Sequence, residues 1–155
     1  MKVLPTLEGG LCIIPESESD WMELEIICSD AVRPAHLAES LADLMDADSD
    51  WEEYVVPDLE ENFNSQCRYV GAAITHARDH NERAVFITRP QAEKWYGAIN
   101  QARLSLEARY KLAAIDGIEG PGPEAAPELR SAYFRDRFYL FLQSMLLEYV
   151  MDVIE

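Results

Sequence analysis

The sequence predicts a mainly α-helical domain of about five helices that carries a small antiparallel β-sheet at one side. Long stretches place apolar residues three and four positions apart, which is the spacing of one helix face. Only three short runs favour β-structure, two near the N-terminus and one near residues 84–88. A chain of 155 residues suggests a single domain over 1–155, long enough to bury a core without disulfides or metal staples.

Residues 1–15 predict a β-hairpin. Two short apolar runs flank Gly9-Gly10, and consecutive glycines supply the positive backbone dihedral angles that a tight turn needs. Pro15 ends the second run, because proline cannot donate a hydrogen bond to a neighbouring strand. We expect the run near 84–88 to pair with this hairpin as a third strand.

Residues 17–114 predict helices interrupted by that one short strand. Ser17 or Ser19 caps the first helix, whose first-turn acids face the positive end of the helix dipole. A second helix is expected after Pro34, with apolar positions at Leu37, Leu41, Leu44 and Met45. The third begins near Pro57, a residue suited to a first helical turn, and its apolar face is Phe63, Cys67, Val70 and Ile74.

Two longer helices complete the prediction. One begins after Thr88, with Gln91 at the capping-box position, and is expected to run to about Ala114. Its apolar stripe is Trp95, Ile99, Ala102, Leu106, Tyr110 and Ala113. A glycine- and proline-rich loop over 115–127 then leads into a terminal helix over 128–155. The apolar residues of that helix are Phe134, Phe138, Phe141, Leu142, Met145, Tyr149 and Val153.

The negative charge of the chain argues against several kinds of partner. Acidic residues number 29 against 13 basic ones, for a net charge of −16. Nucleic-acid affinity comes mainly from lysines and arginines that displace counterions, and anionic membranes repel the same charge. The longest uncharged apolar-rich stretch, Phe138–Leu147, is too short to span a bilayer. We expect no nucleic-acid or membrane binding, and a basic protein surface as the compatible partner.

The cysteines and the N-terminus predict a reduced, cytoplasmic protein. Cys12, Cys28 and Cys67 are widely spaced and odd in number, which fits neither a disulfide framework nor a CxxC metal or redox motif. The N-terminus has no apolar run of signal-peptide length. We therefore expect three small thiols that stay reduced.

The remaining motifs predict no metal, cofactor or catalytic site. The acidic run DADSDWE begins like a calcium loop at Asp46, but Trp51 and Pro57 occupy the positions that need glycine and a bidentate glutamate. His76 and His80 have the spacing of two metal ligands on one helix face, yet no third ligand is near them in sequence. Nucleophile and phosphate-loop motifs are also missing. An enzyme is therefore less favoured than a non-enzymatic protein.

The helix that contains INQARLSLEARY carries three polar residues beside its apolar stripe. Arg103 lies about 60° from the centre of the stripe, Asn100 shares that shoulder, and Arg109 lies on the other. An arginine at the edge of a core must find acceptors, because an unpaired guanidinium in a low dielectric costs several kcal/mol. Two alternatives remain. The three residues clamp this helix to its neighbours, or they bind a carboxylate or phosphate.

The same helix carries a family resemblance. The pattern W-x3-[LI]-N-x2-R-L-x-L-x2-R, from Trp95 to Arg109, resembles the signature helix of a small bacterial domain family of unknown function. Its actinobacterial members are often encoded beside the adaptor of the Clp protease. WEEYVVPDLEENF and YFRDRFYLFLQSMLLEYV are similar to its helix entry and its closing helix. The resemblance implies a helical fold and, through gene neighbourhood, an association with regulated proteolysis.

These observations favour a non-enzymatic acidic protein-interaction or regulatory module. The acidic segment from Asp43 to Glu61, or the exposed part of the terminal helix, would meet a basic partner. The alternative is a small anionic-ligand-binding protein or an enzyme, with a pocket around Asn100, Arg103 and Arg109. A homodimer through the apolar terminal helix is a third hypothesis.

Overall fold

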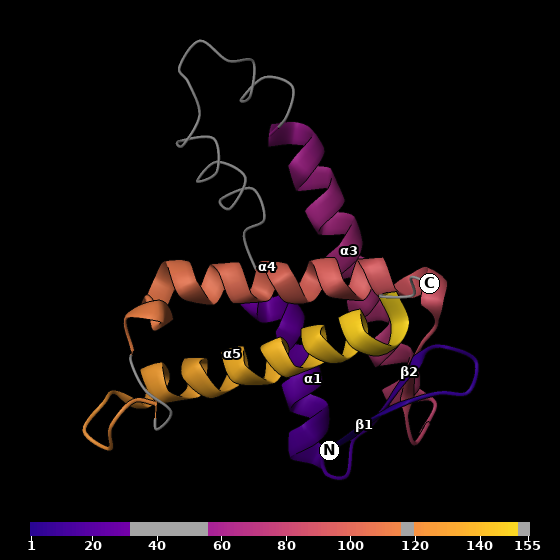
Figure 1. The fold of residues 1–155 in the computed structure, drawn as a ribbon, viewed down its shortest axis with the longest axis horizontal. Helices are drawn as coiled ribbons and strands as arrows, with labels where there is room; N and C mark the ends of the chain where they lie inside the picture. The colour runs from indigo at the N-terminus through magenta and orange to yellow at the C-terminus, as the bar shows by residue number, and fades with distance from the viewer. Residues whose placement is uncertain (32–55, 116–119, 152–155) are drawn as a thin grey trace.

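The computed structural model describes residues 1–31, 56–115 and 120–151, and it is mainly helical with a small antiparallel sheet (Figure 1). Within these residues lie four α-helices, against about five expected from the sequence. The helix expected after Pro34 and the acidic run DADSDWE fall outside the described residues. None of the described helices combines the length and the apolar character needed to cross a membrane.

The sheet has three strands in the order β1-β2-β3, with both neighbouring pairs antiparallel. Strands β1 (Lys2–Pro5) and β2 (Leu11–Ile14) form the expected hairpin, and β3 (Val85–Ile87) pairs with the other edge of β2. The core-facing residues Leu11, Ile13, Val85 and Ile87 are buried, whereas Phe86 between the last two is exposed. Alternation along β2 and β3 therefore places one face of the sheet on the core.

The two glycines of the hairpin turn have different roles. Gly9 has a positive φ of 87°, as the sequence predicts. Gly10 does not have a positive φ. It permits a close approach instead, because a Cβ at Gly10 would lie 2.4 Å from the carbonyl oxygen of Ile87. The expectation that both glycines supply positive dihedral angles is thus correct for Gly9 only.

Helices α1 (Glu18–Asp30) and α3 (Val56–Asp79) begin where local chemistry predicts. Ser17 caps α1 by accepting a hydrogen bond from the Asp20 amide at 3.3 Å. The backbone of α3 begins next to Pro57, which suits the first turn of a helix. The two helices contribute Leu24, Ile27, Val70, Ile74 and Ala77 to the core.

Helix α4 (Ala92–Tyr110) is the central element and packs against α1, α3 and α5. A short 3-10 turn, η2 (Arg89–Gln91), precedes it, and the Gln91 side chain accepts a hydrogen bond from the Thr88 amide at 3.0 Å. Its predicted stripe is correct over most of its length. Trp95, Ile99, Ala102 and Leu106 have no solvent exposure.

The expected end of this helix at about Ala114 is wrong. Lys111 adopts the left-handed conformation, with φ 52°, and ends α4 after Tyr110. A 3-10 turn, η3 (Leu112–Ala114), follows, and the Glu107 carboxylate accepts hydrogen bonds from the Ala113 amide. Leu112 is buried, whereas Ala113 is exposed. Local hydrogen bonding therefore overrides the apolar periodicity at this point.

Helix α5 (Pro127–Leu146) runs beside α4 in the opposite direction and crosses in front of α1 (Figure 1). It continues into a wider π-helical turn, η4 (Leu147–Met151). The apolar residues predicted for this helix divide between two faces. Of the predicted residues, Leu142 is buried, whereas Phe134 and Phe141 are exposed. Tyr139 and Leu146, which the prediction did not include, are also buried.

Candidate functional site

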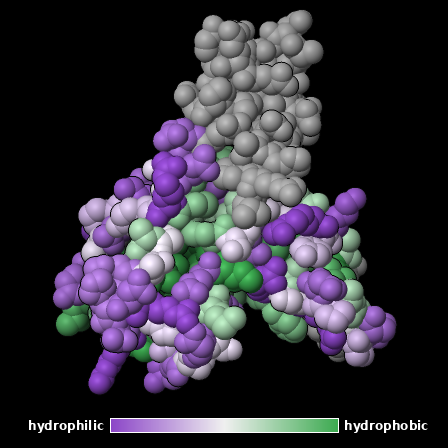
Figure 2. Space-filling view, turned by 180° about the vertical axis from the view of Figure 1, so that it is seen from behind, coloured by the Kyte–Doolittle hydropathy of each residue, from purple (hydrophilic) through white to green (hydrophobic). Residues whose placement is uncertain are grey.

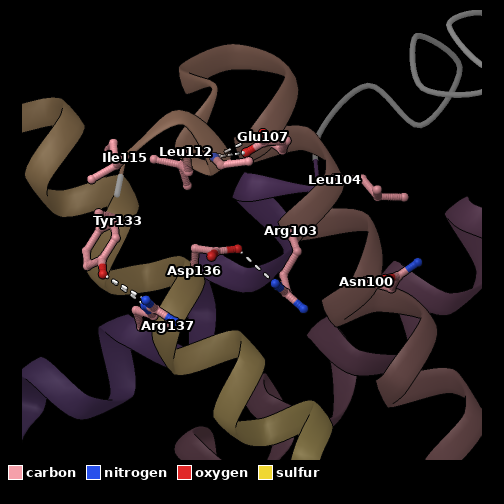
Figure 3. A pocket seen from close by; sticks show the side chains of 10 residues that line it. Asn100, Arg103, Leu104, Glu107, Leu112, Ile115, Tyr133, Asp136 and Arg137 are labelled. Atoms are coloured by element: carbon pink, nitrogen blue, oxygen red, sulfur yellow. Dashed lines mark hydrogen bonds and ion pairs between the residues drawn. The ribbon is translucent and has the colours of Figure 1, made fainter. Parts of the chain in front are cut away.

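A pocket of about 430 Å³ lies between α4 and α5, beside the η3 turn (Figure 3). Helix α4 contributes polar and apolar side chains at steps of three and one, and α5 does the same from the opposite side. Such steps keep side chains on neighbouring parts of one helix face. The lining residues are Asn100, Arg103, Leu104, Glu107, Leu112, Ala113, Ile115, Tyr133, Asp136 and Arg137.

Arg103 connects the two helices across this pocket. Its Nε donates to Asp136 Oδ1 at 3.0 Å, and its Nη1 donates to Gln143 Oε1 at 2.8 Å. Gln143 in turn donates from Nε2 to Asn100 Oδ1 at 3.4 Å. The Arg103 side chain is 31% exposed and lines the pocket while it makes these bonds. Its guanidinium group therefore has a carboxylate partner on α5.

The opposite wall holds a second arginine with a different partner. Arg137 donates from Nε and Nη2 to the Tyr133 hydroxyl at 3.1 and 3.0 Å, and its guanidinium lies 5.1 Å from the Tyr133 ring centroid. The lining thus holds two guanidinium groups and two carboxylates, those of Glu107 and Asp136. Chemically, the pocket can donate hydrogen bonds to an anionic group from Arg137, but its overall charge is balanced.

Arg109 lies outside this pocket. Its Nη2 donates to the backbone carbonyl of Asp30 at 3.3 Å and lies 3.6 Å from Asp30 Oδ1. The structure therefore brings Asn100 and Arg103 together on one side of α4 and places Arg109 on another, against the end of α1. Both arginines bind acceptors on a neighbouring helix.

A buried carboxylate that was not predicted from the sequence joins α1 to α5. Asp30, the last residue of α1, is 3% exposed and accepts hydrogen bonds from Arg135 Nε at 2.7 Å and from Arg135 Nη2 at 3.0 Å. The hydroxyl of Tyr139, one turn further along α5, also donates to it. An aspartate at a helix C-terminus opposes the helix dipole, which was the one local signal of a special role.

Burial and the Asp30 carboxylate affect the ionisation of the neighbouring side chains. Desolvation raises the pKa of Tyr139 far above its ordinary value, and its hydrogen bond to Asp30 adds to the rise. For Arg135, burial favours a lower pKa, but the hydrogen bond and the charge of Asp30 outweigh it and raise the pKa. Arg135 therefore stays charged and Tyr139 neutral in the interior.

The structure also brings together one pair of cysteines and one pair of histidines. Cys28 of α1 donates from Sγ to the Cys67 carbonyl of α3 at 3.2 Å, and the interaction between the two neighbouring thiol side chains lowers the pKa of Cys28 and raises that of Cys67. The His76 and His80 rings lie 4.1 Å apart between centroids on the exposed face of α3. Over 1–31, 56–115 and 120–151, no three His, Cys, Asp or Glu side chains gather as a metal site would require.

Comparison with known protein families matches residues 29–150 to one described as "Domain of unknown function (DUF2017)". The matched region runs from the end of α1 to η4, so it includes the pocket and all of its lining residues. No curated protein and no solved structure matched the chain.

Proposed function

Because the chain belongs to the DUF2017 family, whose description names no activity, we propose its function from its residues: a non-enzymatic interaction module whose acidic exterior binds a basic protein. The family membership agrees with the expected family of unknown function. The link to regulated proteolysis, implied by the resemblance alone, stays part of this proposal. So does a cytoplasmic location.

The observation that carries the proposal is the inward use of positive charge. Arg103, Arg109 and Arg135 each bind an acceptor on another helix of the same chain. Arg78 of α3 pairs with two acids of α1, Glu18 and Glu25. Because these arginines bind acceptors within the chain, they are less available to bind a negatively charged partner.

The acidic residues that outnumber the basic ones make the exterior negatively charged. The whole chain has a net charge of −16, and fields of this size steer partners of opposite charge and raise association rates. Figure 2 shows a mostly hydrophilic face, with hydrophobic side chains gathered near its centre. A net charge of this sign supports recognition of a basic protein more readily than of a nucleic acid.

The test is capture of partners from native lysate at two salt concentrations. At about 0.1 M salt the tagged chain should retain a basic protein, and at about 1 M salt it should release it, because the Debye length falls from about 10 to about 3 Å. A charge-reduced variant should retain less, since its net charge falls from −16 to −12. That variant replaces four exposed glutamates by glutamine, at Glu8, Glu93, Glu124 and Glu128.

The matched control changes exposed polar side chains without changing charge, as Ser131→Ala with Ser144→Ala does on α5. It should behave like the wild-type chain. Retention that is insensitive to salt, or that is equal for the charge-reduced variant and the wild type, would contradict the proposal. The purified partner then gives the salt dependence of the dissociation constant directly.

A second candidate function is supported by the pocket between α4 and α5. Arg137 lines it without a carboxylate partner among the described residues, so a small carboxylate or phosphate could bind there. Inorganic phosphate and acetate are suitable probes, followed by two-dimensional NMR of the labelled chain. Shifts confined to the pocket and abolished by Arg137→Gln, but retained by Arg68→Gln on the exposed face of α3, would support ligand binding. No shift at millimolar probe would exclude these anions.

A further inference from the structure

One face of α5 carries an apolar stripe that the rest of the described chain covers only in part. Phe134, Phe138, Phe141 and Met145 follow one another at steps of four, three and four, which keeps them on one helix face. Phe134 is 65% exposed and Phe141 is 47% exposed, while Phe138 and Met145 are half-buried.

The order of these residues makes the stripe complementary to itself. The steps of four, three and four read the same in both directions along the helix. An antiparallel second copy of α5 would therefore set Phe134 against Met145 and Phe138 against Phe141, each contact occurring twice. A two-fold interface needs this property, because residue i must meet residue j while residue j meets residue i.

The charges at the two ends of the stripe follow the same symmetry. Arg130 lies one helical turn before Phe134, and Glu148 lies three residues after Met145. In the antiparallel arrangement Arg130 of each copy comes to Glu148 of the other. Glu148 is exposed and Arg130 is partly exposed.

We propose that a second copy of this chain docks antiparallel along the apolar stripe of α5, with the two-fold axis passing between Phe138 and Phe141. Aromatic residues, methionine and arginine are the residue types enriched in protein interfaces. The stripe from Phe134 to Met145 is about 17 Å long at 1.5 Å per residue, so the interface is small and the dimer is weak.

The charge of the chain gives this dimer a distinctive salt dependence. Two copies, each with net charge −16, repel one another at long range, and salt screens that repulsion. The apolar contact itself does not weaken with salt. Dimerisation should therefore become tighter as salt is added, whereas binding of a basic partner should become weaker. The two proposals can fail separately for this reason.

The test is sedimentation equilibrium of the full chain from about 1 µM to about 1 mM, a range that brackets weak dissociation constants. The wild type should pass from monomer to dimer within it. Phe134→Asp and Phe141→Asp should each weaken dimerisation at least tenfold. Phe86→Asp is the matched control, since Phe86 on β3 is 61% exposed, and it should leave the dissociation constant unchanged. Circular dichroism confirms that each variant is folded.

A charge exchange tests the geometry itself. Arg130→Glu alone and Glu148→Arg alone should each weaken the dimer, because like charges meet at both ends. A mixture of the two variants should dimerise as well as the wild type, since each heterodimer restores two opposite-charge pairs. A chain that stays monomeric at every concentration would overturn the proposal. So would a dimer insensitive to the Phe134 and Phe141 changes, or a mixture that dimerises no better than its components.

Discussion

Replacing Asp30 with asparagine should destabilise the protein more than any other loss of a single carboxylate considered above. The substitution keeps the size of the side chain but removes its charge. Asp30 is 3% exposed, and the side chain of its partner Arg135 is only 17% exposed. The variant therefore leaves a largely buried guanidinium group without a counterion, and Arg109 loses the same charge at 3.6 Å.

The magnitude follows from the burial of this pair. Breaking a buried ion pair by removing one partner costs about 3–5 kcal/mol. Asparagine retains one oxygen that can accept a hydrogen bond from Arg135 or Tyr139, so we expect the lower end, about 3 kcal/mol. With a denaturant slope of about 2 kcal/mol/M in urea, the unfolding midpoint should fall by about 1.5 M.

The assay is urea unfolding followed by circular dichroism at neutral pH. The matched control is Glu25→Gln on the same helix, which also removes a carboxylate from an arginine, Arg78, at 2.6 Å. Glu25 is 39% exposed, so this change should cost less than about 1 kcal/mol. Equal midpoints for the two variants would refute the reasoning that the Asp30 network stabilises the interior. The double variant Asp30→Asn with Arg135→Met gives a second test. A loss of stability equal to the sum of the two single losses would also refute the reasoning, because the effects of residues in one network are not additive.

Three other perturbations have defined outcomes. Arg103→Met should lower the free energy of unfolding in urea by about 1–2 kcal/mol. This is less than for a fully buried pair, because Arg103 and Asp136 both keep some solvent contact. An unchanged free energy would show that Arg103 does not clamp α4 to α5. Gly10→Ala should lower the free energy of unfolding by about 1–3 kcal/mol, because the added Cβ would collide with the backbone of β3. Gly122→Ala is the control and should be near neutral, because its Cβ would contact only a flexible glutamate side chain. Because the pKa of Tyr139 is raised on folding, its contribution to stability is complete below pH 10 and is lost as pH rises further. Between pH 10 and 11 the wild type should therefore lose about 1 kcal/mol more stability than Tyr139→Phe, and parallel curves would contradict this.

Local chemistry made the starts of the elements predictable. Ser17, Thr88 with Gln91, and Pro57 act on backbone groups within one turn, so each start could be inferred from a few residues. The end of α4 could not be inferred, because the apolar periodicity continues past it. The left-handed conformation of Lys111 and the bonds from Ala113 to Glu107 decided it instead.

The partners of the polar residues could not be predicted, because they are distant in the sequence. Asn100, Arg103 and Arg109 were identified as polar residues at the edge of a core, and that placement depends only on helical spacing. The identity of their partners depends on helices that arrive from elsewhere in the chain. Apart from its position at the end of a helix, no local pattern distinguishes buried Asp30 from the other acids of the sequence.

The sequence by itself determined the helical class, the hairpin with its third strand, the apolar face of α4 and the excess of negative charge, because each depends on composition or on neighbours within one or two turns. The tertiary structure alone decided which groups meet. Arg103 finds Asp136 33 positions away, Arg109 finds Asp30 79 positions away, and Arg135 finds the same aspartate 105 positions away. At such separations, only the packing of α1, α4 and α5 brings donor and acceptor within 3.5 Å.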